Sequence, residues 1–375
     1  MKKKLRPLLK WTGGKFDEFG LFEKYIPTFD RYIEPFFGGG GVFFALKPKG
    51  AALINDKSTD LINFYQQINQ ITFKNELFLY AEAWDEVTTL TNFLWGKFAS
   101  DFVKFIKQKV ELAELTKGLQ QGLNLYLKDT SLLKDEHFVL DFELFKKMLL
   151  GSIVDKAKRI QNIAAKENRH FTRTELLAHF ETGIKSGVYL FFRKLLNLHY
   201  QKKIQLSAAK AAANWYFIRE FCYAAMFRFN SKGEFNIPYG GITYNKKKFK
   251  GKIAKIFTEE VDQLFKQANF SNEDFESFLS NSKLKATDFI FVDPPYDSEF
   301  SEYDQSAFTQ KDQERLANFL LKTPAKWMMV IKETSFIRQL YNHPTIKIEV
   351  FEKNYAYNVR GRNKRGVVHL IIMNY

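Results

Sequence analysis

The chain contains, in its C-terminal third, the stretch Phe289-Ile290-Phe291-Val292-Asp293-Pro294-Pro295-Tyr296. Four successive apolar residues are typical of a short strand that is buried on both faces of a parallel sheet. A polar tetrapeptide follows at once, and Pro295 stiffens it because proline has a fixed φ and no N–H. This stretch therefore predicts an α/β sheet in which a buried strand ends in a rigid loop carrying Asp293 and Tyr296.

The residue types in this loop suit the methylation of an amino group on a flipped nucleobase. An exocyclic amine such as adenine N6 is a poor nucleophile, because its lone pair is delocalised into the ring. The Asp293 carboxylate and the Pro294 carbonyl can accept its two hydrogens, which frees the lone pair. Tyr296 offers an aromatic face on which an extruded base can stack. We therefore predict that Asp293, Pro294, Pro295 and Tyr296 are catalytic, although an ordinary Pro-Pro turn at a strand end has the same sequence features.

Further strands are expected toward both ends of the chain, and helices are expected between them. The expected strands are 31–36, 51–55, 289–292, 326–332, 346–352 and 367–375. A helix is expected over 309–322, where Thr309 and Asp312 have capping-box spacing. Alternating strands and helices favour a doubly wound, Rossmann-like sheet.

The middle of the chain has a different pattern. The segments 101–115, 138–148 and 172–200 show helical spacing with Phe and Leu on one face. Such aromatic stripes indicate a packed core rather than a base-stacking surface. We therefore expect a mostly helical domain over residues 72–281, inserted between two parts of a catalytic domain, 1–71 and 282–375.

A glycine-rich turn follows the first expected strand, in Glu34-Pro35-Phe36-Phe37-Gly38-Gly39-Gly40-Gly41. Glycines allow the backbone to pass close to a ligand. The spacing is not G-x-G-x-x-G, which disfavours a nicotinamide-dependent oxidoreductase. Asp56 ends the second strand, where a carboxylate suits a ribose diol. The earlier Lys10–Lys15 turn adds Trp11, whose indole can pack beside the adenine or the sulfonium of a cofactor.

Composition limits the class of protein. The formal charge is +15 at pH 7, with a pI near 9.4, and favours a polyanionic partner. The single cysteine, Cys222, excludes an intramolecular disulfide, so a reducing cytoplasm suits the chain. Six scattered histidines and no cysteine pair make a structural metal site unexpected. No apolar run reaches membrane-spanning length.

Basic and aromatic residues alternate in the block 219–245 and suit DNA in which a base is flipped out. Lys246 begins a run of lysines that can serve phosphates without sequence preference. A second basic segment, 355–366, joins the last two expected strands. It contains Arg360 and Arg362, which we expect to contact the duplex backbone.

Together these motifs resemble the Dam-type (D12 class, alpha group) DNA adenine-N6 methyltransferases. The resemblance runs in order through Lys10–Lys15, Glu34–Gly40, Asn55-Asp56, Met226–Gly240 and Asp293–Tyr296. It implies base flipping and a seven-stranded sheet with a final antiparallel hairpin, interrupted by a target-recognition domain. It also implies S-adenosylmethionine as methyl donor. The cofactor-binding residues implied are Trp11, Lys15, Phe37, Gly38, Gly40, Asp56 and Asp293.

The same resemblance implies a set of DNA contacts. Arg228 matches the family arginine that reads a guanine, and the residue matching Lys10 touches a base. Tyr223, Met226, Asn230 and Pro238 lie in the matching recognition block. This chain has Tyr223-Ala224-Ala225 where GATC-reading enzymes often show Tyr-Asn-Gly, so its target sequence can differ from GATC. The long middle region favours a restriction-modification enzyme, acting as a monomer on double-stranded DNA beside a separate cognate endonuclease.

Other activities remain open at this point. Cytosine-N4 methylation uses the same amine chemistry, and RNA methylation fits the basic segments less well. A catalytically inactive DNA-binding regulator with this fold is a third possibility. Cytosine-C5 methylation is disfavoured, because it needs a nucleophilic cysteine and Cys222 follows Phe221 rather than a proline.

Overall fold

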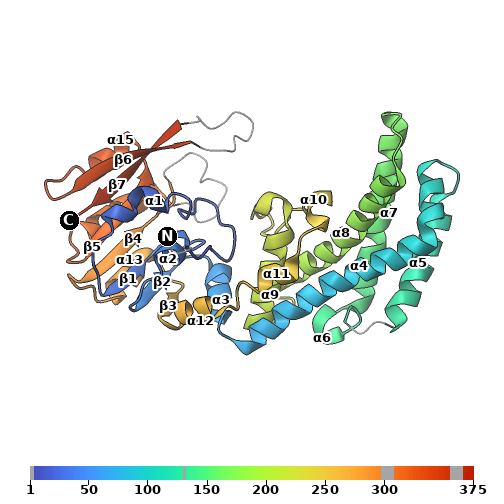
Figure 1. Ribbon diagram of the computed structural model, residues 1–375, viewed down its shortest axis with the longest axis horizontal. Coiled ribbons are helices and arrows are strands. Elements are labelled where there is room, and N and C mark those ends of the chain that lie inside the picture. The colour runs from blue at the N-terminus through green and yellow to red at the C-terminus, as the bar shows by residue number, and fades with distance from the viewer. Residues whose placement is uncertain (1–3, 130–131, 297–307, 355–365) are drawn as a thin grey trace. The chain divides into compact units, whose positions relative to one another are not determined.

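The computed structural model describes residues 4–129, 132–296, 308–354 and 366–375 (Figure 1). The chain divides into two compact units, one made of residues 1–66 and 258–375 and the other of 67–257. We call them the catalytic unit and the helical unit. None of the described helices is both long and apolar enough to cross a membrane.

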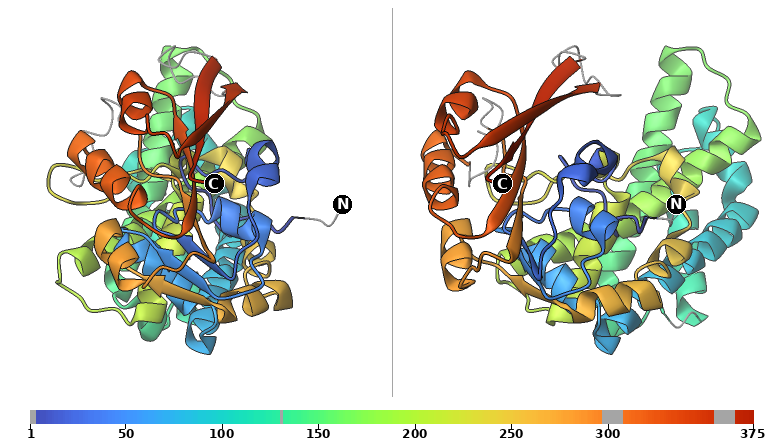
Figure 2. Two further views of the ribbon diagram at one scale, coloured as in Figure 1. Left: turned by 90° about the vertical axis from the view of Figure 1, so that its left-hand side faces the viewer. Right: turned by 60° about the vertical axis from the view of Figure 1, so that its left-hand side comes forward.

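A seven-stranded sheet forms the centre of the catalytic unit, with strand order β3-β2-β1-β4-β5-β7-β6. The strands are β1 (Arg31–Glu34), β2 (Ala52–Asn55), β3 (Ala268–Ser271), β4 (Asp288–Val292), β5 (Lys326–Lys332), β6 (Lys347–Asn354) and β7 (Gly366–Met373). The pairs from β3 to β5 are parallel, whereas β7 is antiparallel to both β5 and β6. Figure 2 shows β6 and β7 side by side from two directions. The expected Rossmann-like sheet with a final antiparallel hairpin is therefore confirmed.

Strand β4 shows why its sequence is apolar without alternation. Ile290 and Val292 pack on one face of the sheet against helices α13 (Phe275–Asn281), α14 (Gln310–Leu320) and α15 (Ser335–Leu340). On the same strand, Phe289 and Phe291 stack with the rings of Phe29 and Phe22. Both faces of β4 are covered, which accounts for the four successive apolar residues Phe289–Val292.

The remaining elements of the catalytic unit are short. They are α1 (Phe19–Phe22), the 3-10 turn η1 (Glu23–Tyr25), α2 (Gly41–Leu46), α3 (Thr59–Gln67) and α12 (Glu259–Lys266). Helix α2 begins directly after the glycine-rich turn.

The helical unit contains long antiparallel helices around an aromatic core. Its elements are α4 (Ile71–Ile106), α5 (Leu112–Asp129), α6 (Glu136–Val139), α7 (Phe142–Lys166), α8 (Arg173–Tyr200), α9 (Ala208–Phe221), η2 (Tyr223–Ala225), α10 (Ile242–Asn245) and α11 (Phe249–Ile253). Rings of Tyr80, Phe192 and Phe217 contact one another at centroid distances of 4.7–5.5 Å. The aromatic stripes expected to be core are therefore buried, as Phe180 and Phe191 also show.

Two sequence-based boundaries differ from the structure. The expected insertion ended at residue 281, whereas the helical unit ends at Phe257. The residues after it return to the sheet as β3, which has the sequence Ala-Asn-Phe-Ser and lies half-exposed at an edge, so it lacks an apolar run. The helix expected over 101–115 is wrong as well. It is two helices, separated after Ile106 by a turn in which Gln108 has a φ of 57°.

Candidate active site

Three loops meet at the carboxyl edge of the parallel strands. Asp293 follows β4, the turn from Pro35 to Gly41 follows β1, and Asp56 follows β2. Since β2, β1 and β4 are adjacent and parallel, their following loops lie at one edge, where open α/β sheets bind ligands. The predicted cofactor and catalytic residues of the strand loops are therefore brought to one place.

Lys15 connects the N-terminal turn to the catalytic loop. Its Nζ donates to Asp293 Oδ1 at 2.7 Å, to the Gly13 carbonyl at 2.9 Å and to Tyr296 Oη at 3.1 Å. The residue is only 2% exposed. Burial lowers the pKa of Lys15, but the negative charge of Asp293 and the contact with Tyr296 raise it well above its ordinary value. Lys15 is therefore a fixed cation that orients Asp293.

His369 and Gln313 support the same loop, and sequence reasoning missed both. Tyr296 Oη lies 3.2 Å from His369 Nε2, and His369 is fully buried on β7. Gln313 of α14, also fully buried, donates from Nε2 to the Pro295 carbonyl at 2.9 Å. A lone histidine within the apolar strand Val367–Met373 was a signal for the first, whereas Gln313 had none.

The glycine-rich turn passes directly beneath Trp11. A Cβ at Gly38 would lie 2.8 Å from Trp11 Cδ1, and one at Gly39 would lie 2.9 Å from Trp11 Cβ. Gly38 and Gly40 also have φ of 50° and 68°, which side chains rarely adopt. Only glycine fits this close approach, and Trp11 and the turn form one surface.

Asp56 is tied to the same turn. Its Oδ2 accepts from the Gly38 N–H at 2.8 Å, and its Oδ1 accepts from the Ser58 N–H at 2.8 Å. Burial raises the pKa of Asp56, while these two backbone bonds oppose the rise. Each carboxylate oxygen has a second lone pair, so the group retains acceptor capacity for a ribose hydroxyl.

A further acid, Glu34, lies beneath these loops at the end of β1. It is 2% exposed, and its Oε2 accepts from Tyr32 Oη at 2.8 Å. Burial, together with the charges of Asp293 and Asp56, raises the pKa of Glu34 well above its usual range, although the bond from Tyr32 lowers it. Burial and the two nearby carboxylates therefore disfavour the charged form of Glu34.

In the helical unit, the predicted DNA-binding residues lie between α9 and α11, in residues 222–248, which we call the recognition loop. Tyr223 and Met226 are 54% and 45% exposed, and Arg228, Pro238 and Lys246 are exposed as well. Asn230 differs, because its Oδ1 accepts from the N–H groups of Lys232 and Glu234 and so shapes a hairpin turn. Lys10, in the catalytic unit, is exposed. Arg360 and Arg362 lie outside the described residues.

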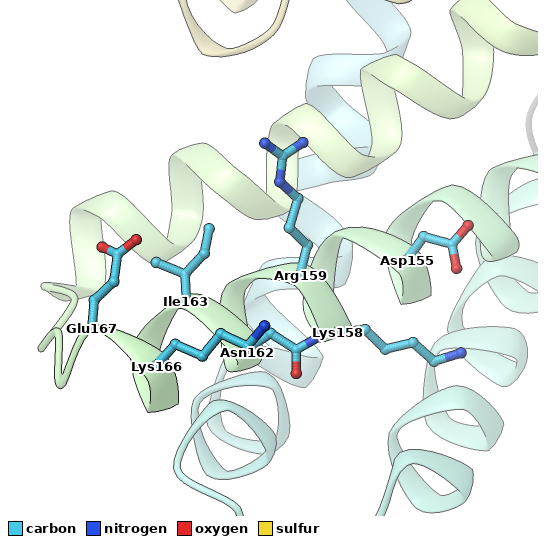
Figure 3. Close-up of a pocket in the computed structure, with 7 residues that line it drawn as sticks. All are labelled: Asp155, Lys158, Arg159, Asn162, Ile163, Lys166 and Glu167. Atoms are coloured by element: carbon cyan, nitrogen blue, oxygen red, sulfur yellow. The ribbon is translucent and has the colours of Figure 1, made fainter.

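A surface hollow of about 380 Å³ lies along α7 (Figure 3). Its lining residues are Asp155, Lys158, Arg159, Asn162, Ile163, Lys166 and Glu167. None of the residues assigned to cofactor, catalysis or DNA contributes to it, so it is separate from the loops described above.

Comparison with known proteins decides what these loops belong to. The family model described as D12 class N6 adenine-specific DNA methyltransferase matches residues 11–181 and 142–357, which together span most of the chain. The chain belongs to this family. Membership of the D12 methyltransferases means that it is an adenine-specific DNA methyltransferase, which acts on DNA and requires a methyl donor.

Individual relatives match along nearly their whole length. The chain is 25% identical to the type II methyltransferase M.CviBI of Paramecium bursaria Chlorella virus NC1A, over 99% of this chain and all of that protein. It is also 25% identical to the type II methyltransferase M.MjaIII of Methanocaldococcus jannaschii, over 99% of both chains. The DNA adenine methylase of Serratia marcescens is 23% identical over 96% of each chain. Both units therefore have counterparts in D12 relatives.

Proposed function

We propose that this D12 methyltransferase transfers a methyl group from S-adenosylmethionine to adenine N6 at a specific site in double-stranded DNA, with the target base flipped out. The observation that carries the proposal is the Asp293 carboxylate, held 2.7 Å from the Lys15 ammonium at the carboxyl end of β4. This places an oriented acceptor beside the aromatic ring of Tyr296, whose centroid lies 5.3 Å from the same ammonium.

The residues at the strand ends fit S-adenosylmethionine. Glycine at positions 38 and 40 lets the turn pack closely against Trp11, Phe37 and Phe44, which keeps the turn at the carboxyl edge of the sheet, where we assign the cofactor. Asp56 would hold the ribose diol, and Trp11 and Phe37 would flank the cofactor. Lys15 and Asp293 complete the set of cofactor contacts that we assign. When bound, S-adenosylmethionine supplies an electrophilic methyl group on a sulfonium centre.

The catalytic loop would prepare the amine for attack. Asp293 and the Pro294 carbonyl accept the two N6 hydrogens, and Tyr296 stacks on the flipped adenine. The bond from Gln313 to the Pro295 carbonyl and the contact of Tyr296 with His369 hold this loop in one conformation. Because no covalent enzyme intermediate is required, positioning supplies most of the rate enhancement.

The exposed residues of the loop in the helical unit would read DNA. Arg228 has the bidentate geometry that suits guanine, and Tyr223 and Met226 offer apolar groups beside it. Pro238 lies on the same loop, and Asn230 would shape it from within. Lys246 would neutralise phosphate, and we assign Lys10 to a base and Arg360 and Arg362 to the duplex backbone.

The biological setting that we propose is restriction-modification. Full-length relatives include proteins named type II methyltransferases, whose length this chain matches. We propose that the enzyme acts as a monomer in the cytoplasm and protects sites from a separate cognate endonuclease. An inactive DNA-binding role is opposed by the intact contacts among Lys15, Asp293 and Tyr296.

Nucleoside mass spectrometry tests the reaction directly. Unmethylated duplex DNA is incubated with the purified protein and S-adenosylmethionine, then digested and analysed. We expect N6-methyldeoxyadenosine from the wild type and roughly a thousandfold less, in the same time, from Asp293→Ala. N4-methylcytosine alone would contradict the adenine assignment, and no product from a wild type that binds the cofactor would contradict DNA methylation.

A further inference from the structure

Every fourth residue along the second half of helix α8, up to its C-cap residue, has a polar side chain that faces the recognition loop. The row consists of Lys185, Tyr189, Arg193, Asn197 and Gln201. Residues four apart lie on one ridge of a helix, inclined to its axis. Each of these five side chains donates a hydrogen bond to the segment from Glu234 to Asn245. We call this row the α8 ladder.

The ladder acts mainly on main-chain atoms. Lys185 Nζ donates to the Asn245 carbonyl at 2.7 Å, and Tyr189 Oη donates to the Ile237 carbonyl at 2.9 Å. Arg193 Nη1 donates to the same Ile237 carbonyl at 2.9 Å. Because these bonds involve no side chain of the loop, they determine the path of its backbone whatever side chains it carries.

Asn197 makes a two-point contact within this row. Its Nδ2 donates to the Phe235 carbonyl at 3.1 Å, and its Oδ1 accepts from the Phe235 N–H at 2.8 Å. A primary amide thus pairs with both polar groups of one residue, as a neighbouring strand would. Asn197 is 9% exposed, so water competes little for these bonds.

The segment held by the ladder alternates in burial. Phe235, Ile237 and Tyr239 are buried, whereas Asn236 and Pro238 are exposed. This is the pattern of a strand with one face on a core and the other toward solvent. The ladder therefore sets which side chains of this segment face outward.

The held segment is in turn paired with the segment that carries Arg228. Phe235 forms an antiparallel bridge with Phe229, and the Asn236 N–H donates to the Arg228 carbonyl at 3.5 Å. The backbone of Arg228 is thus linked to helix α8 through the segment that contains Phe235 and Asn236.

We infer that the α8 ladder positions the recognition loop and thereby sets the enzyme's discrimination between target and near-target DNA sequences. The inference rests on the proposed function, and its residues are positioning residues, since none of them is assigned to touch DNA. Loop side chains can then differ between enzymes of different specificity, while the ladder keeps the backbone that presents them.

Two variants remove ladder bonds with little change in shape. Tyr189→Phe deletes only the hydroxyl, and Asn197→Leu replaces the amide with an apolar group of similar size. The matched control is Asn214→Leu. Asn214 is a fully buried asparagine of α9 whose Nδ2 donates to the Phe192 carbonyl at 3.1 Å, within the helices rather than to the loop.

The first readout is hydrogen exchange of the amides in residues 234–239, which does not depend on activity. We expect exchange to accelerate by about tenfold in Tyr189→Phe and Asn197→Leu, because each loses hydrogen bonds that oppose local opening. The control should leave these amides unchanged relative to the rest of the unit. Unchanged exchange in both ladder variants would overturn the inference even if the wild type methylates DNA.

The second readout is the ratio of kcat/KM on the target site to kcat/KM on sites with one base pair changed. We expect this ratio to fall by about tenfold in the ladder variants, with S-adenosylmethionine affinity unchanged. If Asn214→Leu lowers this ratio as much as the ladder variants do, at a similar loss of Tm, then the ratio reports general stability. That result would contradict a role of the ladder in discrimination. A wild type without methylation would instead refute the proposed function, and the exchange result would still decide whether the ladder holds the loop.

Discussion

The catalytic unit and the helical unit position their functional groups in different ways. In the catalytic unit, Asp293 and Asp56 each follow directly on a strand, so backbone hydrogen bonds of a parallel sheet set where they lie. In the helical unit, Arg228 lies on a loop without a long strand of its own, and side chains of α8 hold that loop. The residues that we assign to chemistry are therefore positioned by the sheet, whereas the residue that we assign to base recognition is positioned by side-chain contacts from a neighbouring helix.

The largest effect should come from breaking the chemistry at the sheet edge. Asp293→Ala removes the acceptor that we assign to the adenine amine, and we expect methyl transfer to slow by roughly a thousandfold, in the range seen for lost transition-state hydrogen bonds. Single-turnover kinetics with saturating cofactor and DNA measure this loss. DNA binding should persist, because the recognition loop belongs to the other unit.

A control is needed because Asp293→Ala also leaves the buried Lys15 ammonium without its carboxylate, which costs stability. The double variant Lys15→Met with Asp293→Ala removes both charges. If the double variant folds well but methylates slowly, the loss of methyl-transfer rate comes from the chemistry rather than from instability. Near-normal turnover in either folded variant would contradict the mechanism.

Cofactor affinity should depend on Asp56 and on pH. We expect Asp56→Ala to weaken S-adenosylmethionine binding by about ten- to a hundredfold, as for hydrogen bonds to a charged group. Burial raises the pKa of Asp56, so the wild type should lose affinity on acidification at a higher pH than an ordinary aspartate would allow. Calorimetric titration across pH measures both effects, and an Asp56→Asn variant should lack the acid-side decline. If the affinity of Asp56→Asn declines on acidification as it does in the wild type, another group is responsible for the pH dependence.

Arg228 and Lys246 should separate sequence reading from phosphate binding. Arg228→Ala should relax specificity at one base position, by about 1–3 kcal/mol. Lys246→Ala should weaken binding evenly across sequences and reduce its salt dependence. Binding isotherms on target and near-target duplexes at two salt concentrations measure both. An even loss from Arg228→Ala would remove that arginine from base recognition.

The smallest effect concerns backbone strain in the recognition loop. Ala224 and Ala225 have φ of 54° and 53°, in the left-handed region that is unfavourable for a residue with a Cβ. Ala225→Gly should therefore raise the free energy of unfolding, by up to about 1 kcal/mol. The matched control is Ala211→Gly inside helix α9, which should lower it by about 1 kcal/mol. Thermal denaturation compares them, and equal destabilisation would contradict the strain.

The contrast between the units also explains what the sequence could predict. The strand Lys326–Lys332 and the helix that Thr309 caps were predicted to within two residues, because apolar runs and capping boxes are local signals. The loops that carry Asp293 and Asp56 were each predicted from local motifs, and the strand order of the structure brings them to one edge. Strand β3 was missed, because a half-exposed edge strand needs no apolar run.

Contacts between distant segments were not predictable from local patterns. Gln313 lies 18 residues after Pro295 and belongs to none of the motifs in the sequence. Only the folded structure brings its side-chain amide to the Pro295 carbonyl. The α8 ladder was hidden for a similar reason. Four of its polar residues lie in a helix predicted correctly and the fifth, Gln201, directly follows it, but their partners come 33 to 60 residues later.

Single-molecule sequencing of unmethylated genomic DNA, after incubation with the purified protein and S-adenosylmethionine, tests the central claim most directly. We expect N6-methyladenine at one recurring sequence motif, with methylation strongly reduced in Asp293→Ala and spread to related motifs in Arg228→Ala. Methyladenine without a recurring motif in the wild type, or a different modified base, would contradict the assignment of chemistry to the sheet edge and of recognition to the loop held by α8.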